Sequence, residues 1–388
     1  MTIKLCSDII DKQDIDNLIS WLETLPRLTK GQKTLEFEEM FSSYLGCEHS
    51  IFCNSGSSAN LLITSALIQS GVLKNDKVVV PQVSWSTTVF PSMQLGLEPI
   101  MCDCNMSNLG IALDHFKWIV KYHKPSALIL VHVLGLDSNI EEIVRICQDN
   151  GIILIEDTCE SLGSSVSGTK LGNFGFASSY SFYFGHHIST IEGGMVCTND
   201  KEFADIIKMI RSHGWDRDLD EETRTKYKKE HNVKEFDALY KFYYQGFNLR
   251  STDLQAVIGL SQIPKIENIS ETRDKNYRHY LENLKDELWK PKSDQEVVSN
   301  MGYPLIVANR DELSNALADN DIECRPLVSG SMGTQPAWKK EYGELNMKNA
   351  SIVNDSGMYV PNHQDLTIED IDKVCNIINS TGKNLDRN

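Results

Sequence analysis

The chain has 388 residues, of which 41% are hydrophobic and 24% charged, an ordinary globular composition that argues against disorder. Its 38 lysines and arginines are outnumbered by 54 aspartates and glutamates, which gives a formal charge of -16. A surface this negative repels phosphate backbones and anionic lipid, so we expect neither nucleic acid nor a membrane as a partner.

Ten cysteines are scattered without a regular spacing, and residues 1–8 lack the apolar run of a secretory signal. The longest apolar stretches, such as 127–133, are far shorter than the roughly 20 residues of a membrane span. We therefore expect a cytoplasmic protein with free thiols. Cys102 and Cys104 form a close pair, but no second pair or neighbouring histidine completes a zinc site, so no metal is expected.

Short β-rich runs alternate with helical patterns along the first half of the chain. This alternation predicts an α/β fold with a mostly parallel sheet covered by helices on both faces. The apolar run at 127–131 fits a strand that is buried on both sides. Strands are expected at 77–80, 99–104, 127–133, 152–156, 178–184 and 195–198, and helices at 59–69, 140–150 and 201–212.

The second half of the chain begins with a break in this pattern. Residues 216–237 are densely charged, which favours a solvated surface excursion over a loop that closes on a site. Later signals, a helix at 252–263, strands at 302–307 and 322–327 and a helix at 368–378, predict a small α+β domain. We therefore divide the chain into a large domain, residues 1–248, and a small C-terminal domain, residues 249–388.

Residues 54–60 read Asn-Ser-Gly-Ser-Ser-Ala-Asn, between a β-like run at 50–53 and a helix. Small residues let the backbone approach an anion closely, and the amides and dipole of a helix N-terminus favour phosphate. This motif predicts a phosphate site. The alternative is an ordinary helix cap.

The apolar run at 152–155 ends in Glu156 and Asp157, and Glu160 follows three residues later. Ligands of doubly wound sheets bind outside the carboxyl ends of the strands. A carboxylate at that place can pair with a protonated ring nitrogen, which an electron-accepting pyridine requires. The alternative is an aspartate that caps the next helix.

His186 and His187 follow the strand expected at 178–184. Neighbouring strand residues face opposite ways, so we expect one histidine to point into a site and the other away from it. Ser181 offers a hydroxyl for a phosphate, and Gly193 and Gly194 allow the chain to reverse into the next strand.

Together these motifs resemble the DegT/DnrJ/EryC1/StrS family of nucleotide-sugar aminotransferases, a branch of the fold-type I, aspartate aminotransferase-like enzymes. The resemblance covers nearly the whole chain. It is carried by six landmarks in order, namely Ser-Gly-Ser at 55–57, Pro-Gln-Val-Ser-Trp-Ser-Thr-Thr at 81–88, Glu-Asp-Thr-Cys-Glu at 156–160, Ser-Phe-Tyr at 181–183, Glu-Gly-Gly at 192–194 and Gly-Phe-Asn-Leu-Arg at 246–250.

The resemblance implies a pyridoxal 5'-phosphate cofactor and a homodimer with shared active sites. Gly56, Ser57 and Ser181 would hold the cofactor phosphate, and Asn248 would reach it from the other subunit. The ring contacts implied by the resemblance are stacking by Trp85, pairing of the ring nitrogen with Asp157, and Glu160 near the hydroxyl edge of the ring.

The sequence departs from the family at the residue that should anchor the cofactor. The family pattern has a lysine five residues after the serine and six before the Glu-Gly-Gly, and both counts reach His186. Imidazole cannot anchor the cofactor covalently as a lysine amine does, but it moves protons near neutral pH. We therefore expect His186 to be catalytic and the cofactor to be held non-covalently, as pyridoxamine 5'-phosphate.

The histidine, together with residues 186–190 and 323–326, resembles the sugar 3-dehydratases of 3,6-dideoxysugar pathways within this family. Some of these enzymes add a cysteine-ligated iron–sulfur cluster, but here no cysteine lies between Cys197 and Cys324, which favours the cluster-free type. The implied reaction removes the C3 hydroxyl of a nucleotide-linked 4-keto-6-deoxy sugar, with GDP-4-keto-6-deoxymannose favoured. L-Glutamate would be the amino donor, and ammonia would be released.

Two alternatives remain at this stage. One is a nucleotide-sugar aminotransferase that uses another lysine; Lys170 is close in the sequence, but its spacing is wrong. The other is a catalytically inactive partner protein that binds the cofactor. No motif identifies the nucleotide.

Overall fold

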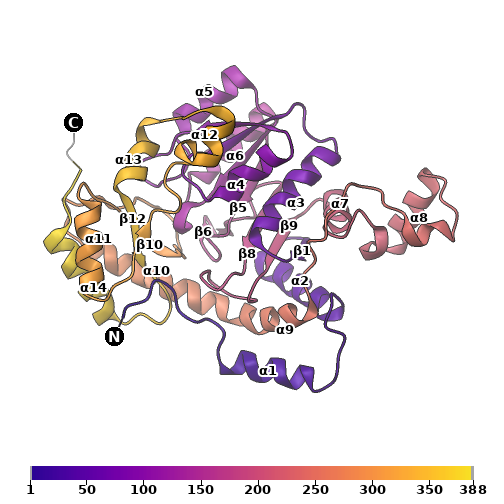
Figure 1. The fold of residues 1–388 in the computed structure, drawn as a ribbon, viewed down its shortest axis with the longest axis horizontal. Coiled ribbons are helices and arrows are strands. Elements are labelled where there is room, and N and C mark those ends of the chain that lie inside the picture. Colours follow the sequence, from indigo (N-terminus) through magenta and orange to yellow (C-terminus); the bar gives the residue numbers. More distant parts are fainter. Residues whose placement is uncertain (1, 386–388) are drawn as a thin grey trace.

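The computed structural model describes residues 2–385 and is built on a seven-stranded sheet in the order β1-β9-β8-β5-β4-β2-β3 (Figure 1). All strands except β9 run in the same direction, so their carboxyl ends meet at one edge. The predicted α/β fold with a mostly parallel sheet is confirmed. The strands are β1 (His49–Cys53), β2 (Lys77–Pro81), β3 (Glu98–Cys102), β4 (Ala127–Val131), β5 (Ile153–Asp157), β8 (Ala177–Ser181) and β9 (Gly194–Thr198).

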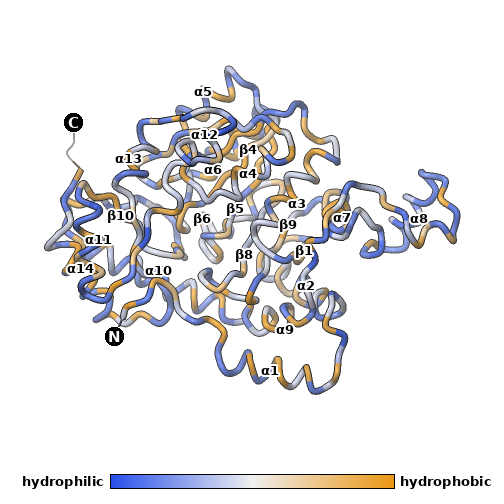
Figure 2. The backbone as a smooth tube through the Cα atoms, in the orientation of Figure 1, coloured by the Kyte–Doolittle hydropathy of each residue, from blue (hydrophilic) through white to orange (hydrophobic). Residues whose placement is uncertain are grey.

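Helices cover both faces of this sheet, because its strands carry apolar side chains on both sides. One core joins the strands to α3 (Gly56–Gln69), α4 (Ser86–Gln94) and α7 (Lys201–Arg211). The other joins them to α5 (Leu113–His123) and α6 (Ile140–Asn150). Hydrophobic colour accordingly gathers along the central strands (Figure 2).

A third group of helices packs near the edge strand β1. Helix α2 (Gln32–Leu45) contacts β1 and α9 (Asp253–Gln262), and α1 (Lys12–Leu22) lies on α9 (Figure 1). Phe37 and Phe41 of α2 form edge-on aromatic contacts with Phe182, at 5.6 and 5.5 Å between ring centroids. This core fixes the chain just after β8, where the histidine pair follows.

The C-terminal region contains a separate three-stranded sheet in the order β10-β12-β11. Its core also includes Tyr277 and Tyr280 of α10 (Ile266–Asn283), a helix whose first turn belongs to the core around α2. Because α9 and the start of α10 pack with the N-terminal part, the domain boundary at 248/249 stays a prediction. The elements of this region are β10 (Gly302–Ile306), α11 (Arg310–Asp319), β11 (Arg325–Pro326), α12 (Pro336–Tyr342), α13 (Lys348–Ser356), β12 (Gly357–Pro361) and α14 (Ile368–Thr381).

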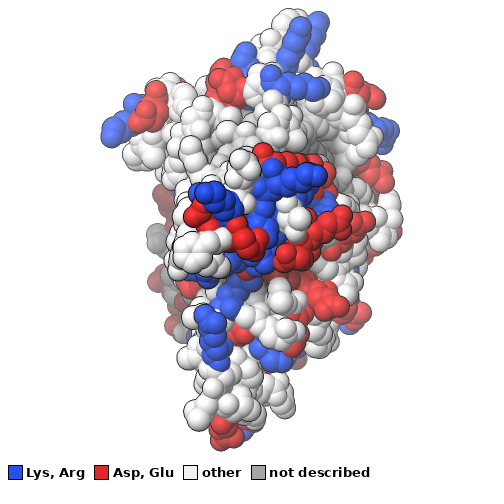
Figure 3. All heavy atoms as spheres, turned by 90° about the vertical axis from the view of Figure 1, so that its right-hand side faces the viewer, with Lys and Arg blue, Asp and Glu red and all other residues white. Residues whose placement is uncertain are grey.

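The densely charged segment forms helix α8 (Glu221–Glu230), which projects from the body and has no buried residue (Figure 1). Basic and acidic side chains are interleaved on the face at this end of the molecule (Figure 3). The structure therefore contains, at residues 216–237, the solvated surface excursion that the dense charge favoured. A short hairpin of β6 (Ser165–Val166) and β7 (Thr169–Lys170) completes the fold. Within residues 2–385, no helix combines the length and apolar character needed to span a membrane.

Candidate active site

The N-terminus of α3 forms a cradle of small residues at the carboxyl end of β1. Ser55 caps the helix, its hydroxyl accepting a hydrogen bond from the Ser58 amide at 3.1 Å. A Cβ on Gly56 would lie 2.5 Å from the Cβ of Ser181, so only glycine allows α3 to approach the end of β8 this closely. Ser57 is exposed in the first turn. The structure thus brings Gly56, Ser57 and Ser181 together where the helix dipole attracts an anion.

Asp157 lies at the carboxyl end of β5 and is only 3% exposed. Its Oδ2 accepts hydrogen bonds from Asn60 Nδ2 and Thr88 Oγ1, each at 2.8 Å. The amide of Cys159 donates to Oδ1 at 3.2 Å. Asn60 is itself held by Ser179, whose hydroxyl donates to Asn60 Oδ1 at 2.6 Å. The carboxylate is therefore rigidly oriented.

No lysine, arginine or histidine in the described part of the chain forms an ion pair with Asp157. A buried carboxylate is costly unless it is paired with a cation or fully hydrogen-bonded. Neutral donors fix this one and leave its charge uncompensated within the chain. A protonated heteroaromatic nitrogen would supply the missing positive charge.

Glu160 is buried near Asp157, and the amide of Leu134 donates to its Oε2 at 2.7 Å. Burial raises the pKa of Glu160 to about 7, and the negative charge of Asp157 adds to the rise, partly offset by the Leu134 amide. Glu160 can therefore exist as a neutral acid near physiological pH and donate a hydrogen bond, which an ionised carboxylate cannot do.

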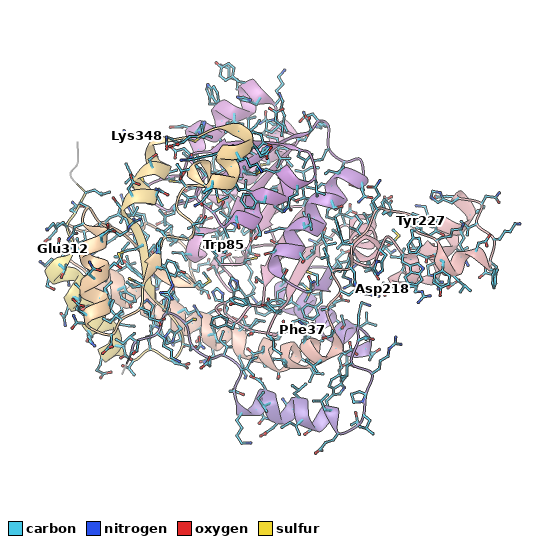
Figure 4. The ribbon with its side chains drawn as sticks, in the orientation of Figure 1. Phe37, Trp85, Asp218, Tyr227, Glu312 and Lys348 are labelled. Carbon is cyan, nitrogen blue, oxygen red and sulfur yellow. The ribbon has the colours of Figure 1, made fainter. Side chains whose placement is uncertain are left out.

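Trp85 is the residue before α4, and its side chain is 54% exposed. Figure 4 shows it near the middle of the molecule, between the central sheet and the C-terminal region. A large apolar side chain left this exposed in such a place has a free face on which a flat ring can stack.

His186 lies in the segment after β8, partly buried. Its Nδ1 is buried and has no hydrogen-bond partner in the described chain. Burial lowers the pKa of His186 to about 4, although the charge of Asp157 and the Cys159 backbone both act to raise it. The imidazole is therefore neutral at pH 7 and has a free nitrogen, the state required of a general base.

His187 has different surroundings. It is completely buried, and its Nε2 lies 2.9 Å from the carbonyl oxygen of Ser299. His187 is thus anchored to the loop at Ser299, whereas the Nδ1 of His186 has no partner among the described residues.

Two residues considered from the sequence are not joined to this cluster. Asn248 is exposed, and its Oδ1 accepts a hydrogen bond from Arg250 at 3.1 Å. Lys170 donates to the Tyr44 carbonyl and to Glu267, each at 2.9 Å. Its amine is therefore occupied on the outer side of α2 and α10, which disfavours it as a replacement for the missing anchoring lysine.

The roles of Asn60 and Thr88 were not predicted from the sequence. Both lie inside motifs recognised there, but only the fold shows that their side chains converge on Asp157. In all, the cluster combines an anion cradle, an exposed indole, a buried carboxylate without a cation and a neutral imidazole. These features fit a phosphorylated pyridine with a protonated ring nitrogen.

The sheet and the site at its carboxyl edge define a fold-type I, aspartate aminotransferase-like protein. The chain belongs to the DegT/DnrJ/EryC1/StrS aminotransferase family, whose model matches residues 8–379.

Among the curated relatives, GDP-4-keto-6-deoxy-D-mannose 3-dehydratase of Yersinia pseudotuberculosis is 32% identical, over 96% of this chain and 97% of the relative. Lipopolysaccharide biosynthesis protein RfbH of Salmonella typhimurium is 30% identical, over 89% of this chain and 84% of the relative. GDP-perosamine synthase of Caulobacter vibrioides is 26% identical, over 96% of each chain. Similar proteins thus include a 3-dehydratase and a GDP-perosamine synthase.

Two crystal structures of GDP-4-keto-6-deoxymannose-3-dehydratase are closely similar. One is a histidine-to-asparagine variant with bound GDP-perosamine, with a TM-score of 0.89 and 31% identity, matching 97% of this chain and all of the other. The second holds a trapped PLP-glutamate geminal diamine, with a TM-score of 0.87 and 30% identity, matching 97% of this chain and 99% of the other.

Proposed function

We propose that this chain is a pyridoxal/pyridoxamine phosphate-dependent 3-dehydratase of a nucleotide-linked 4-keto-6-deoxy sugar. GDP-4-keto-6-deoxymannose is the favoured substrate, L-glutamate the amino donor, and ammonia a product. The observation that carries this proposal is His186, a neutral histidine with a free nitrogen at the place of the family's anchoring lysine. The relatives named as 3-dehydratases, similar over nearly the whole chain, support it.

The cofactor would be held without a covalent bond to the protein. Gly56, Ser57 and Ser181 would bind its phosphate, Trp85 would stack on its ring and Asp157 would pair with the ring nitrogen. Glu160, close to Asp157, would face the hydroxyl edge. When bound, the cofactor supplies an amine that condenses with the keto group and a ring that accepts electrons.

The chain contributes charge placement and proton transfer. Asp157 keeps a positive charge on the ring favourable, since a carboxylate in contact with a cation stabilises its protonated form. His186 takes up the proton released during the reaction on its free imidazole nitrogen. The resulting imidazolium can return that proton to the departing C3 hydroxyl, which makes the hydroxyl a better leaving group.

We also propose that the protein works in the cytoplasm as a homodimer in which Asn248 reaches the cofactor phosphate of the other subunit. The exposed position of Asn248 supports this, because its side chain lies open to solvent and its Oδ1 accepts a hydrogen bond from the exposed Arg250.

The test is a panel of nucleotide-linked 4-keto-6-deoxy sugars, each supplied with cofactor and L-glutamate while ammonia release is followed. With the cofactor supplied as pyridoxal phosphate, which carries no amine, we expect release with a GDP-linked sugar and none when glutamate is omitted. Ser57→Ala should slow the reaction and Lys170→Gln should not, because the amine of Lys170 is bound elsewhere. Absence of ammonia with every sugar, while the purified protein retains cofactor, would favour the inactive partner protein.

A further inference from the structure

Arg273 of α10 is a buried cation outside the proposed cofactor contacts. It is 1% exposed, and its Nη1 donates to the carbonyl oxygens of Asn300 at 2.9 Å and Asn362 at 2.7 Å. Its Nε is buried without a partner, and no carboxylate among residues 2–385 forms an ion pair with it. Burial lowers the pKa of Arg273 to about 10, so the guanidinium is still charged at pH 7.

A buried arginine without a carboxylate is expensive, since backbone carbonyls compensate only part of the lost hydration. The two carbonyl oxygens that Arg273 contacts belong to two different loops, at residues 300 and 362, which meet at α10. Asn362 returns a hydrogen bond from Nδ2 to the Arg273 carbonyl at 3.0 Å and also contacts Asn300. Arg273 therefore fastens residues 300 and 362 to α10.

The same loop also holds His187. Ser299 precedes Asn300, and its carbonyl is the partner of His187 at 2.9 Å. The amide of Ser299 donates to Ser164 Oγ at 2.9 Å, so the backbone around this residue is fixed from two sides. Since His187 adjoins His186, the position of the proposed base depends on a loop that Arg273 secures.

The charge of Arg273 acts on the same histidines. The charged groups that face His186 are Asp157 from β5, which raises its pKa, and Arg273 from α10, which lowers it. Neutral His187 lies next to it, and Arg273 also lowers the pKa of His187. The arginine therefore adds to the effect of burial, which is the main cause of the lowered pKa of His186, and opposes the effect of Asp157.

We propose that Arg273 is a positioning residue for the proposed reaction: it fixes the loop against which His187 docks, and through His187 it sets the place of His186. The proposal rests on the proposed function only in naming His186 as the base. The effect of the Arg273 charge on His186 can be tested without turnover.

The test is the NMR titration of the His186 imidazole in the cofactor-loaded protein, with the signal assigned by its loss in His186→Asn. Arg273→Gln removes the charge, so the His186 titration midpoint should move to higher pH. Arg273→Lys keeps the charge but cannot reach both carbonyls, so the midpoint should stay near wild type while turnover falls. Lys275→Gln, on the exposed side of the same helix, is the matched control and should leave both unchanged.

Arg273→Met provides a second uncharged variant if Arg273→Gln does not fold, and the His186 midpoint should again rise. An unchanged midpoint in a folded Arg273→Gln or Arg273→Met protein would overturn the effect of the charge, and full turnover in Arg273→Lys would overturn the positioning role. If wild type releases no ammonia but the midpoints move as expected, the proposed function fails and the influence of Arg273 on His186 stands.

Discussion

At the scale of single residues, the proposed site uses Asp157 and His186 in different ways. Asp157 is buried, three neutral donors orient its carboxylate, and no cationic side chain among residues 2–385 forms an ion pair with it. His186 must stay neutral although Asp157 is near, and burial accomplishes this. The proposed chemistry requires both states at once, since an electron-accepting ring needs the carboxylate and proton removal needs the free imidazole.

Asp157→Asn should retain cofactor and lose turnover. The amide preserves the shape but removes the charge that opposes the ring nitrogen, and that interaction matters most when charge develops in the transition state. We expect a fall of orders of magnitude in the rate constant of ammonia release, measured with cofactor occupancy checked by absorbance. Near wild-type turnover would mean that the ring is not the electron acceptor.

His186→Lys should convert the site to covalent cofactor attachment and abolish dehydration. The ε-amine would occupy the place of the imidazole but act as a nucleophile instead of a proton carrier. Borohydride should then fix the cofactor onto the variant and leave none on the wild-type protein, as mass spectrometry of the intact chain can show. Ammonia release at the wild-type rate in the variant would exclude His186 as the base.

The pKa of His186 also predicts a pH dependence of stability. Its value of about 4 in the folded protein lies below the ordinary 6.5, so the unfolded chain binds more protons between these values. The contribution of His186 is thus complete above pH 6.5 and lost as the pH falls toward 4. Relative to His186→Asn, the cofactor-free protein should lose about 2 kcal/mol between pH 7 and pH 5, measured by urea unfolding. Parallel losses in both proteins would contradict the buried, neutral state.

At the scale of elements, the close approach of α3 to β8 makes the anion cradle. Gly56→Ala should disrupt it, because the added Cβ would lie 2.5 Å from the Cβ of Ser181 and both backbones belong to regular elements. We expect about 1–3 kcal/mol of lost stability from overpacking, together with weaker cofactor retention. Gly185→Ala is the control, because the added Cβ meets open space. Gly71→Ala would not serve, because its positive φ would strain an alanine. Equal cofactor affinity in Gly56→Ala and wild type would show that the cradle does not bind the cofactor phosphate.

The elements best predicted from sequence are those whose signal is local. Helix α6 was expected at 140–150 and has those bounds, because its apolar residues recur with helical spacing. Strand β12 was not predicted, and β11 is only two residues long against the expected six. These short strands form because they pair with one another in a small sheet, and a local sequence pattern carries no information on such pairing.

The same limit applies to the site. The motifs around Gly56, Asp157 and His186 were visible in the sequence because each is contiguous. The convergence of Asn60 and Thr88 on Asp157, and the contact of His187 with Ser299, join segments far apart in the chain. Such contacts follow from the topology of the sheet and the packing of α10, so they could not be predicted from local sequence.

At the scale of the whole molecule, we propose that the active site is shared between two copies of the chain. Asn248→Ala should then weaken cofactor retention, because a charge-assisted hydrogen bond to phosphate contributes about 1.5–3 kcal/mol. Equilibrium dialysis of the cofactor, with the oligomeric state followed by light scattering, measures this. A monomer that binds cofactor and turns over normally at low concentration would refute the shared site, and Asn309→Ala on the far C-terminal region serves as the control.

The identity of the sugar product tests the central claim most directly. Purified protein with cofactor, L-glutamate and GDP-4-keto-6-deoxymannose should yield a sugar that has lost its C3 oxygen and kept its C4 keto group, with ammonia formed in equal amount. Mass spectrometry and NMR of the product establish both points. A product that keeps the C3 hydroxyl and carries an amine at C4 would show an aminotransferase and contradict the account.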